Sequence, residues 1–380
     1  MGVPTRTIER AVRVSGLTLF SGAAVRMTIE PAESGSGVVF VREDLGGVRV
    51  PARWDLATGG AGQRHTVLTG DGAARIETVE HVMSALAGTG VSDAVIRLSG
   101  AETPMFDASA APIAALLIEA GIVQTGWRAV MPIVNHLRIE GERSAGVEGV
   151  GVGGGAGEIQ ARGMTEEEFA EFGQALVCEY ELDYGPGAVI SKQRARWVVS
   201  HQRPDAEGYL EEIAPARTFC TLAEAEQMRA RGMFAHVEEG QTLVIGAEGA
   251  VGSAERLPQE PARHKVLDMI GDLALVGGPA VCGVVKGVRS GHALNIKLAQ
   301  LLAVIGASGA GGGGGGGRGG VAGGLGGGGG GRVGGGVLWV VGWEGGGGRG
   351  AGGGGWGGVA GRWHGAGSTR GRGGQLVGAG

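Results

Sequence analysis

Residues 263–273 have the sequence RHKVLDMIGDL, in which the polar residues repeat at helical spacing. At about 100° per residue, His264, Asp268 and Asp272 fall on one face of a helix, and Lys265 flanks them. The opposite side is apolar and consists of Val266, Leu267, Ile270, Leu273 and Ala274. An amphipathic helix normally turns its charged side chains toward water, so a solvated face is one interpretation of this pattern.

A metal site is the other interpretation. His264 and Asp268 are four residues apart, so they stand one turn above each other and can share one ion. Zinc binds imidazole nitrogen and carboxylate oxygen, and a catalytic zinc needs about three protein ligands with one position left open. The segment Thr78-Val79-Glu80-His81 offers the third ligand. Adjacent Glu and His at a helix start are also common as capping and surface residues, and this alternative stays open.

Glycine is unevenly distributed along the 380 residues, a length that allows two domains. From Ala307 onward, 41 of 74 residues are Gly, against 83 in the whole protein. Glycine-rich sequence cannot offset the backbone entropy that folding removes, so residues 307–380 are predicted to be disordered. Because G-rich codons encode such residues in any frame, we hypothesise a frameshift here. A genuine Gly/Arg-rich tail, which could contact RNA, is the alternative.

The charge and the cysteine content of the chain indicate which partners and which cellular compartment to expect. The chain before the tail carries 27 Lys and Arg against 37 Asp and Glu, which argues against broad nucleic-acid binding. Cys178, Cys220 and Cys282 have no CxxC spacing, so we expect a reducing compartment and no disulfide framework. The N-terminus lacks the apolar core of a signal peptide, and no uncharged apolar run reaches the length of a membrane span. We therefore expect a soluble, cytoplasmic protein, and we expect a monomer.

The order of predicted elements indicates an α+β fold in two similar halves, residues 1–130 and 131–306. In the first half we predict strands at 7–14, 25–29, 37–41 and 93–98, a helix with Thr78 as its N-cap, and a helix at 110–120. In the second half we predict strands at 137–140, 176–182, 241–245 and 280–285 and helices at 222–231, 263–274 and 298–305. Residues 143–174 are predicted to be an insertion. Two similar halves, each with polar residues on one helix, suggest an internal duplication.

Two further segments carry polar groups suited to chemistry. Residues 216–219, Ala-Arg-Thr-Phe, present the hydroxyl of Thr218 beside the ring of Phe219. Residues 290–295, Ser-Gly-His-Ala-Leu-Asn, place His292 in a turn next to Gly291, where backbone freedom lets a side chain be aimed. A lone His in such a turn is often structural or exposed. It follows the His264 helix by one strand, however, so it can return to the same end of that helix.

These segments together resemble one family, the zinc-dependent UDP-3-O-acyl-N-acetylglucosamine deacetylase of lipid A biosynthesis. The matching segments are TVEH at 78–81, MFDASAAP at 105–112, ARTF at 216–219, RHKxxDxxGDL at 263–273 and SGHALN at 290–295. They occur in the family's order and nearly its spacing, and they cover most of residues 5–305. The resemblance implies two similar domains, each a two-layer sandwich of sheet and helices, with the active site between them.

The resemblance also implies a role for each site residue. It makes His81, His264 and Asp268 the ligands of Zn²⁺ and Glu80 the general base toward the attacking water. It makes Thr218 a stabiliser of the oxyanion, and His292, in its protonated form and beside Asp272, the general acid. Lys265 and Phe219 would contact the substrate, an acylated UDP-sugar. The expected products are acetate and the free 2-amino sugar nucleotide, in the committed step of lipid A biosynthesis.

Some positions depart from the family pattern. Phe20 stands where the family usually has His, Cys220 replaces Gly, and Ile296 replaces a second Asn. Residues 235–239, Ala-His-Val-Glu-Glu, replace a segment like Gly-Ser-Leu-Asp-Asn. None of these changes removes a proposed ligand, acid or base. The alternatives are a different metal-dependent hydrolase, such as a phosphohydrolase, and a non-catalytic homologue that binds a sugar nucleotide or lipid.

Overall fold

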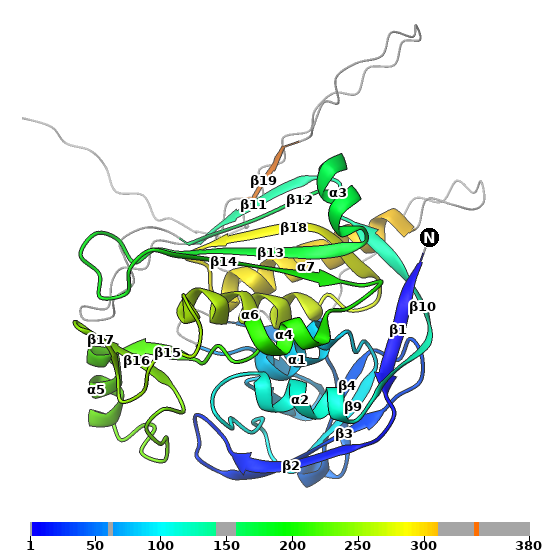
Figure 1. The fold of residues 1–380 in the computed structure, drawn as a ribbon. Helices are drawn as coiled ribbons and strands as arrows, with labels where there is room; N and C mark the ends of the chain where they lie inside the picture. Colours follow the sequence, from blue (N-terminus) through cyan, green and yellow to red (C-terminus); the bar gives the residue numbers. More distant parts are fainter. Residues whose placement is uncertain (1, 60–63, 142–156, 311–337, 342–380) are drawn as a thin grey trace, which may run out of the picture.

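The computed structural model describes residues 2–59, 64–141, 157–310 and 338–341, and its architecture is mixed α+β, as predicted (Figure 1). A layer of helices lies between two β-sheets, so that each sheet covers one side of the helical layer (Figure 1). The helices of the described residues are α1 (Glu80–Thr89), α2 (Ala111–Glu119), α3 (Glu166–Phe172), α4 (Ala206–Glu212), α5 (Leu222–Ala230), α6 (Glu260–Ala274) and α7 (His292–Ala310). None of them is both long enough and apolar enough to cross a membrane.

One of the two sheets comes from the first part of the chain and has the order β2-β3-β9-β4-β5. Its strands are β2 (Val12–Leu17), β3 (Ala24–Pro31), β4 (Val38–Arg42), β5 (Val48–Pro51) and β9 (Ala94–Leu98). β9 lies between β3, which it meets antiparallel, and β4, which it meets parallel. A small sheet of β6 (Ala57–Thr58), β7 (Val67–Thr69) and β8 (Arg75–Glu77) leads into α1.

The other sheet has eight strands and is centred on β18 (Ala280–Val288). β18 lies between β12 and β13, and its first residues also pair with β10. The other strands are β1 (Gly2–Ile8), β10 (Ile122–Pro132), β11 (His136–Glu140), β12 (Glu158–Arg162), β13 (Ala175–Leu182), β14 (Gln193–Ser200) and β19 (Leu338–Val341). β15 (Phe219–Thr221), β16 (Leu243–Gly246) and β17 (Gly249–Val251) form a small separate sheet that packs with α5.

The predicted duplication and domain boundaries stay predictions. β10 crosses the predicted boundary after residue 130, and β1, from the start of the chain, joins the eight-stranded sheet through it. β12 and α3 lie in the second part of the predicted insertion, and residues 142–156 lie outside the described residues. The strand predicted over residues 7–14 is two strands, because the chain turns at Glu9–Ala11.

Three other expectations were wrong in detail. Thr78 is not the N-cap of α1: its φ is 59°, and Val79 precedes the helix with no side-chain cap. His292 does not lie in a turn but is the first residue of α7, a longer helix than the one predicted at 298–305. Within the predicted disordered tail, residues 307–310 end α7, and 338–341 pair with β11 as β19. The rest of the tail, 311–337 and 342–380, lies outside the described residues, so its predicted disorder stays a prediction. The sequence Leu-Trp-Val-Val at 338–341 is rich in strand-forming residues, unlike the glycine around it.

α1 and α6 pack against each other at the centre of the helical layer. Val82 and Leu86 of α1 and Ile270 and Leu273 of α6 are buried in one continuous hydrophobic core. The closest approach is at Gly271, where an added Cβ would lie 2.0 Å from the carbonyl oxygen of Glu80. Only glycine lets the two backbones come this close. The glycine therefore sets how near the side chains of α1 come to those of α6.

We expect Gly271→Ala to destabilise the fold. Alanine favours a helix by about 1 kcal/mol over glycine, but the clash with Glu80 is overpacking of the kind that costs about 1–3 kcal/mol or more. Urea unfolding should show a net loss of stability. Gly100→Ala is the matched control, because its Cβ would meet only Val25 at an ordinary 3.6 Å. Equal stability of both variants would refute the close crossing.

Candidate metal centre and active site

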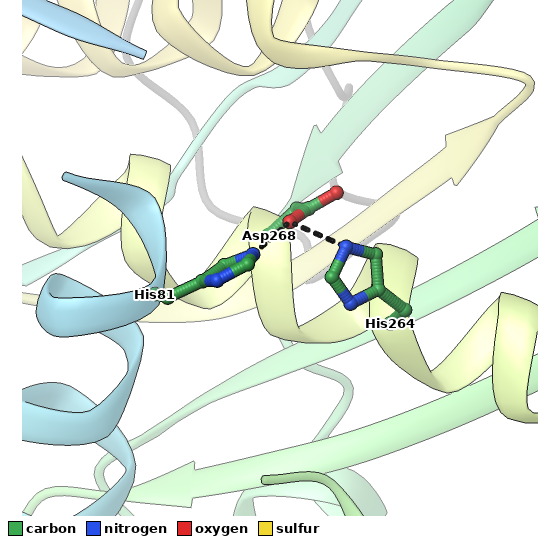
Figure 2. Close-up of side chains that lie close together, drawn as sticks. All are labelled: His81, His264 and Asp268. Atoms are coloured by element: carbon green, nitrogen blue, oxygen red, sulfur yellow. Dashed lines mark ion pairs between the residues drawn. The ribbon is translucent and has the colours of Figure 1, made fainter. Parts of the chain in front are cut away.

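Three potential metal ligands from two helices converge at the crossing of α1 and α6. His81 projects from α1 toward His264 and Asp268 of α6 (Figure 2). One ligand atom from each residue can be chosen so that all three lie within 4.8 Å of one another. The Oδ1 atom of Asp268 lies 3.4 Å from Nε2 of His264 and 3.8 Å from Nε2 of His81. All three side chains are buried, which excludes the interpretation of a solvated helix face.

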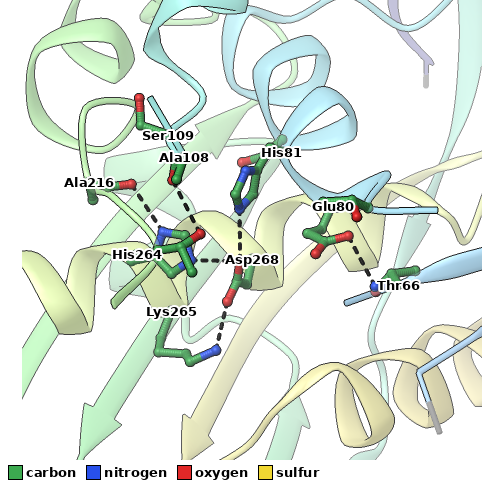
Figure 3. A network of polar contacts seen from close by, with 12 residues as sticks. Thr66, Glu80, His81, Ala108, Ser109, Ala216, His264, Lys265 and Asp268 are labelled. Carbon is green, nitrogen blue, oxygen red and sulfur yellow. Dashed lines mark hydrogen bonds and ion pairs between the residues drawn. The ribbon is translucent and has the colours of Figure 1, made fainter. Parts of the chain in front are cut away.

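The ligand candidates are oriented by further hydrogen bonds (Figure 3). Nδ1–H of His264 donates to the carbonyl oxygen of Ala216 at 3.0 Å. The lone pair of Nε2 is therefore free to bind a metal. Nζ of Lys265 donates to Oδ2 of Asp268 at 2.7 Å, which leaves Oδ1 turned toward the histidines. Metal-binding histidines and carboxylates are typically held in this way by an outer hydrogen bond.

The site fits a divalent cation on two grounds. Oδ1 of Asp268 is buried and has no hydrogen-bond partner among the described residues, an arrangement that is costly unless a cation contacts the oxygen. Burial and the neighbouring His264 lower the pKa of His81 to about 3, and burial also lowers the pKa of His264. Both imidazoles are therefore neutral at pH 7 and have a lone pair to give to a metal.

Glu80 lies next to the ligand candidates at the start of α1. Its Oε2 accepts the backbone N–H of Thr66 at 3.0 Å (Figure 3). Its Oε1 lies 4.0 Å from Nε2 of His292. Burial raises the pKa of Glu80 to about 8, although the positive charge of His292 opposes this shift. A carboxyl with a pKa near neutrality is suited to accept and return a proton.

His292 is held by a buried group of polar side chains. Its Nδ1–H donates to Oδ2 of Asp272 at 2.9 Å. Asp272 also accepts from the hydroxyl of Thr66 at 2.6 Å and from the amide of Asn295 at 2.9 Å. Burial would lower the pKa of His292, but Asp272 and Asp268 outweigh it and raise the pKa to about 9. His292 is therefore protonated at neutral pH, and its Nε2–H lies 3.8 Å from Oδ2 of Asp268.

A cavity of about 100 Å³ opens beside Glu80 and His81 and is lined on its other sides mainly by apolar groups. Thr218 and Phe219 also line it, as do Arg64 and Arg229, and the ring of Phe219 is 6.0 Å from that of His264. The hydroxyl of Thr218 donates to the carbonyl oxygen of Ala108 at 3.2 Å. The apolar lining includes Leu19, Phe20, Met228, Phe234, Val237 and Val244. The cavity thus connects the polar side chains of the candidate site with a mainly apolar space.

The segment that presents Ala216, Thr218 and Phe219 is held by a buried ion pair. Nε of Arg217 lies 2.8 Å from Oε1 of Glu260, and both side chains are almost fully buried. The other guanidinium nitrogens of Arg217 donate to the carbonyls of Gly240 and Ala254 and to the hydroxyl of Ser253. Because Ala216 precedes Arg217, this network fixes the carbonyl that orients His264.

The structure brings all nine residues singled out from the sequence to one region, while their roles stay predictions. These are Glu80, His81, Thr218, Phe219, His264, Lys265, Asp268, Asp272 and His292. Sequence reasoning missed Thr66, which bonds both Glu80 and Asp272, because a single Thr outside any motif gives no signal. It also assigned no role to Arg217 or Asn295, although both lie in the matched segments.

A family model and individual proteins with similar sequences both indicate the same deacetylase family. The model of the family described as LpxC, UDP-3-O-acyl N-acetylglycosamine deacetylase, matches residues 5–304. A UDP-3-O-acyl-N-acetylglucosamine deacetylase of Anaeromyxobacter sp. (strain Fw109-5) is 36% identical over 299 residues, which are 78% of this chain and 87% of that protein. The protein of the same name from Xanthomonas campestris pv. campestris (strain B100) is 36% identical over 303 residues, covering 78% and 89%.

We expect Arg217→Met to lower the free energy of unfolding by about 3–5 kcal/mol, because it leaves the carboxylate of Glu260 buried without its partner. Chemical denaturation of the purified variant measures this loss. Arg97→Met is the control, since the pair Arg97–Glu30 is about a third exposed and should change stability by no more than about 1 kcal/mol. Similar small losses in both variants would contradict the structural role of the buried pair.

Proposed function

Because this chain belongs to the UDP-3-O-acyl N-acetylglycosamine deacetylase family, we propose that it uses Zn²⁺ to hydrolyse the acetamide of UDP-3-O-[(3R)-3-hydroxyacyl]-N-acetylglucosamine. Membership makes the chain a deacetylase and therefore a hydrolase. One observation carries the proposal: His81, His264 and Asp268 meet in a buried site that also contains Glu80 and His292.

Zinc is the metal that suits this set of ligands. Two imidazole nitrogens and one carboxylate oxygen are typical of catalytic zinc sites, which keep a further position open for water or substrate. A bound Zn²⁺ lowers the pKa of a coordinated water and polarises the carbonyl of the acetamide. His81, His264 and Asp268 would hold the ion, and Lys265 and the carbonyl of Ala216 keep two of these ligands in position.

Glu80 is proposed to be the general base. Its Oε2 is occupied by the N–H of Thr66, so Oε1 is the oxygen available to take a proton from the attacking water. The raised pKa of Glu80 would make it a stronger base than an exposed carboxylate. A nearby cation favours the ionised form, so Glu80 would be deprotonated once the metal is bound.

His292 is proposed to be the general acid. It carries the proton that the departing sugar nitrogen needs, and Asp272 holds the ring through Nδ1 so that Nε2–H faces the site. Proton transfer from Nε2 to that nitrogen would release the free amine. Thr66 and Asn295 bind Asp272 from other directions and keep its carboxylate in place.

Thr218 is proposed to stabilise the oxyanion that forms on the acetamide carbonyl. Its hydroxyl donates to the carbonyl of Ala108, so it must rotate about its side-chain bond to donate to substrate. The apolar cavity next to Thr218 and Phe219 is suited to the acyl chain of the substrate. Lys265, which lies beside Asp268 on α6, is proposed to face the sugar nucleotide of the substrate.

We also propose that the two halves, residues 1–130 and 131–306, arose by duplication as two sandwiches of sheet and helices. The observation in support is that α1 of one half and α6 of the other carry the ligand candidates. Because every proposed catalytic group comes from a single chain, a monomer would suffice for activity. The free cysteines Cys178, Cys220 and Cys282 agree with the expected cytoplasmic location.

The first test measures acetate release and bound zinc together. We expect release by the full chain to stop on chelation and to return with Zn²⁺. His264→Ala should lose both zinc and activity, because it removes a ligand. Glu80→Gln should keep about one zinc per chain but lose activity by a factor of about 10² or more, because it keeps the shape and removes the base.

Lys286→Gln is the control for these variants, because Lys286 lies on β18 and is exposed. It should match the unaltered protein in both zinc content and rate. A folded, zinc-loaded protein that releases no acetate would refute the proposed reaction. A fully active Glu80→Gln variant would be compatible with the proposed deacetylation and would exclude Glu80 as the general base.

The second test concerns pH. Asp272 raises the pKa of His292, so Asp272→Asn should lower that pKa and make His292 lose its proton at a lower pH. If His292 acts as an acid, the alkaline limb of the kcat/KM profile shifts toward lower pH by about one unit or more. Asp71→Asn, at an exposed position, should leave the profile unchanged. An unshifted alkaline limb in Asp272→Asn would show that His292 is not the acid.

A further inference from the structure

A second cavity, of about 90 Å³, lies at the C-terminal ends of α1 and α6. Leu86 of α1 and Leu273 of α6 form part of its apolar wall. α1 has ten residues and is about 15 Å long, and Glu80 and His81 are at its other end. The space is several times the roughly 10–15 Å³ that one water molecule needs. It is large enough for a small ion together with water, and it is separate from the proposed active site.

Three basic side chains line this second cavity. Arg6 comes from β1, Arg128 from β10, and His201 from the segment after β14. The guanidinium of Arg6 donates to the carbonyls of His201 at 3.1 Å and Gln202 at 2.6 Å. Nε2 of His201 lies 2.8 Å from the carbonyl oxygen of Val281. Nε of Arg128 is buried and has no hydrogen-bond partner among the described residues.

Within the described residues, the two arginines of this cavity form no ion pair. Over the described ranges of the chain, neither Arg6 nor Arg128 has a carboxylate oxygen within 4.0 Å. The carboxylate whose charge acts on Arg128 is that of Asp93. Its two oxygens already accept the N–H of Gly37 and the hydroxyl of Ser92. The charge of Asp93 favours the ionised form of Arg128, but the two side chains form no direct ion pair.

Burial makes this imbalance costly. It lowers the pKa of both Arg128 and Arg6; for Arg128 the negative charge of Asp93 opposes this shift, and the positive charge of Arg6 adds to it. It also lowers the pKa of His201 to about 4, so this ring is neutral at pH 7. A buried charge without a partner destabilises a fold unless something compensates it. Two guanidinium groups line one cavity, and the Nε of Arg128 there is buried without a hydrogen-bond partner among the described residues, which favours an anion as the ligand.

We propose that the cavity between β1, β10, α1 and α6 is a binding site for a small oxyanion, with the phosphate group as its preferred ligand. The planar guanidinium of Arg128 offers its N–H groups as a fork that matches two oxygens of phosphate. Arg6 supplies the second positive charge and is already held by two carbonyls. The bound ion would connect β1 and β10 to the helices that carry the proposed catalytic groups.

The test is the thermal unfolding of the zinc-loaded full chain as inorganic phosphate is added at constant ionic strength with NaCl. We expect the Tm to rise saturably with phosphate, because the ion binds only the folded protein. Arg128→Gln should weaken the apparent affinity by about tenfold or more, since it removes charge-assisted hydrogen bonds. Arg49→Gln, at an exposed position of β5, is the matched control and should respond like the unaltered protein.

A second measurement separates a binding site from a merely structural arginine. Without phosphate, Arg128→Gln should have a higher Tm than the unaltered protein, because it removes a charge that burial disfavours and that forms no direct ion pair. With saturating phosphate, the order of the two Tm values should reverse. Arg128→Lys keeps the charge but loses the fork, so it should bind phosphate more weakly while retaining some response.

Two further Tm measurements show which kind of phosphate binds and whether it binds at the candidate metal centre instead. Glycerol 1-phosphate in place of inorganic phosphate shows whether a phosphate ester also enters or only the free ion does; either would support the site. A Tm rise that persists in Arg128→Gln but is lost in His264→Ala would place phosphate on the metal and overturn the proposal. A Tm that follows ionic strength alone, with no additional effect of phosphate, would overturn it as well.

Discussion

The close crossing of α1 and α6 is the constraint on which the site depends. Gly271 has no side chain, and this lets α6 approach the backbone of Glu80 more closely than any other residue would allow. His81 follows Glu80 and therefore faces His264 and Asp268 across the same crossing. Neither helix carries a complete set of ligands. The three ligand candidates come together only where the two helices dock, so they are brought together when the chain folds.

Burial at this crossing turns ordinary polar residues into reactive ones. The same loss of water raises the pKa of Glu80 and keeps His81 neutral, whereas the neighbouring carboxylates keep His292 charged. Such differences are stable only because each group has a fixed partner. Thr66 and Asn295 hold Asp272, while the Arg217–Glu260 pair fixes the segment that orients His264. The site is thus preorganised by contacts that involve no substrate, which is the condition for strong electrostatic stabilisation in catalysis.

Periodicity was enough to predict α6 and the shared face of His264, Asp268 and Asp272, because helical spacing is a local property. It could not decide whether that face meets water or another helix, since the answer depends on α1, far away in the chain. Thr78 looked like an N-cap, but it adopts a positive φ instead and donates its hydroxyl toward Glu102. Thr66 left no signal because its role arises from contacts with residues up to 226 positions away. Local sequence patterns were thus enough to predict the helices and the candidate site residues. The residues that they contact depend on tertiary packing.

Phe20, Cys220 and Val237, of the segments that depart from the family pattern, line the apolar cavity, whereas Ile296 is buried in α7; the candidate metal ligands are unchanged. Phe20 packs against Phe234, with ring centroids 5.6 Å apart, and also against His65. Nε2 of His236, from the replaced segment 235–239, lies 2.9 Å from the carbonyl oxygen of Thr18, in the loop that carries Phe20. The changes at position 20 and at 235–239 are therefore physically linked, since the two loops contact each other at the cavity. A chain altered in this way keeps the charged groups proposed for the reaction and differs in the lining of the cavity proposed for the acyl chain.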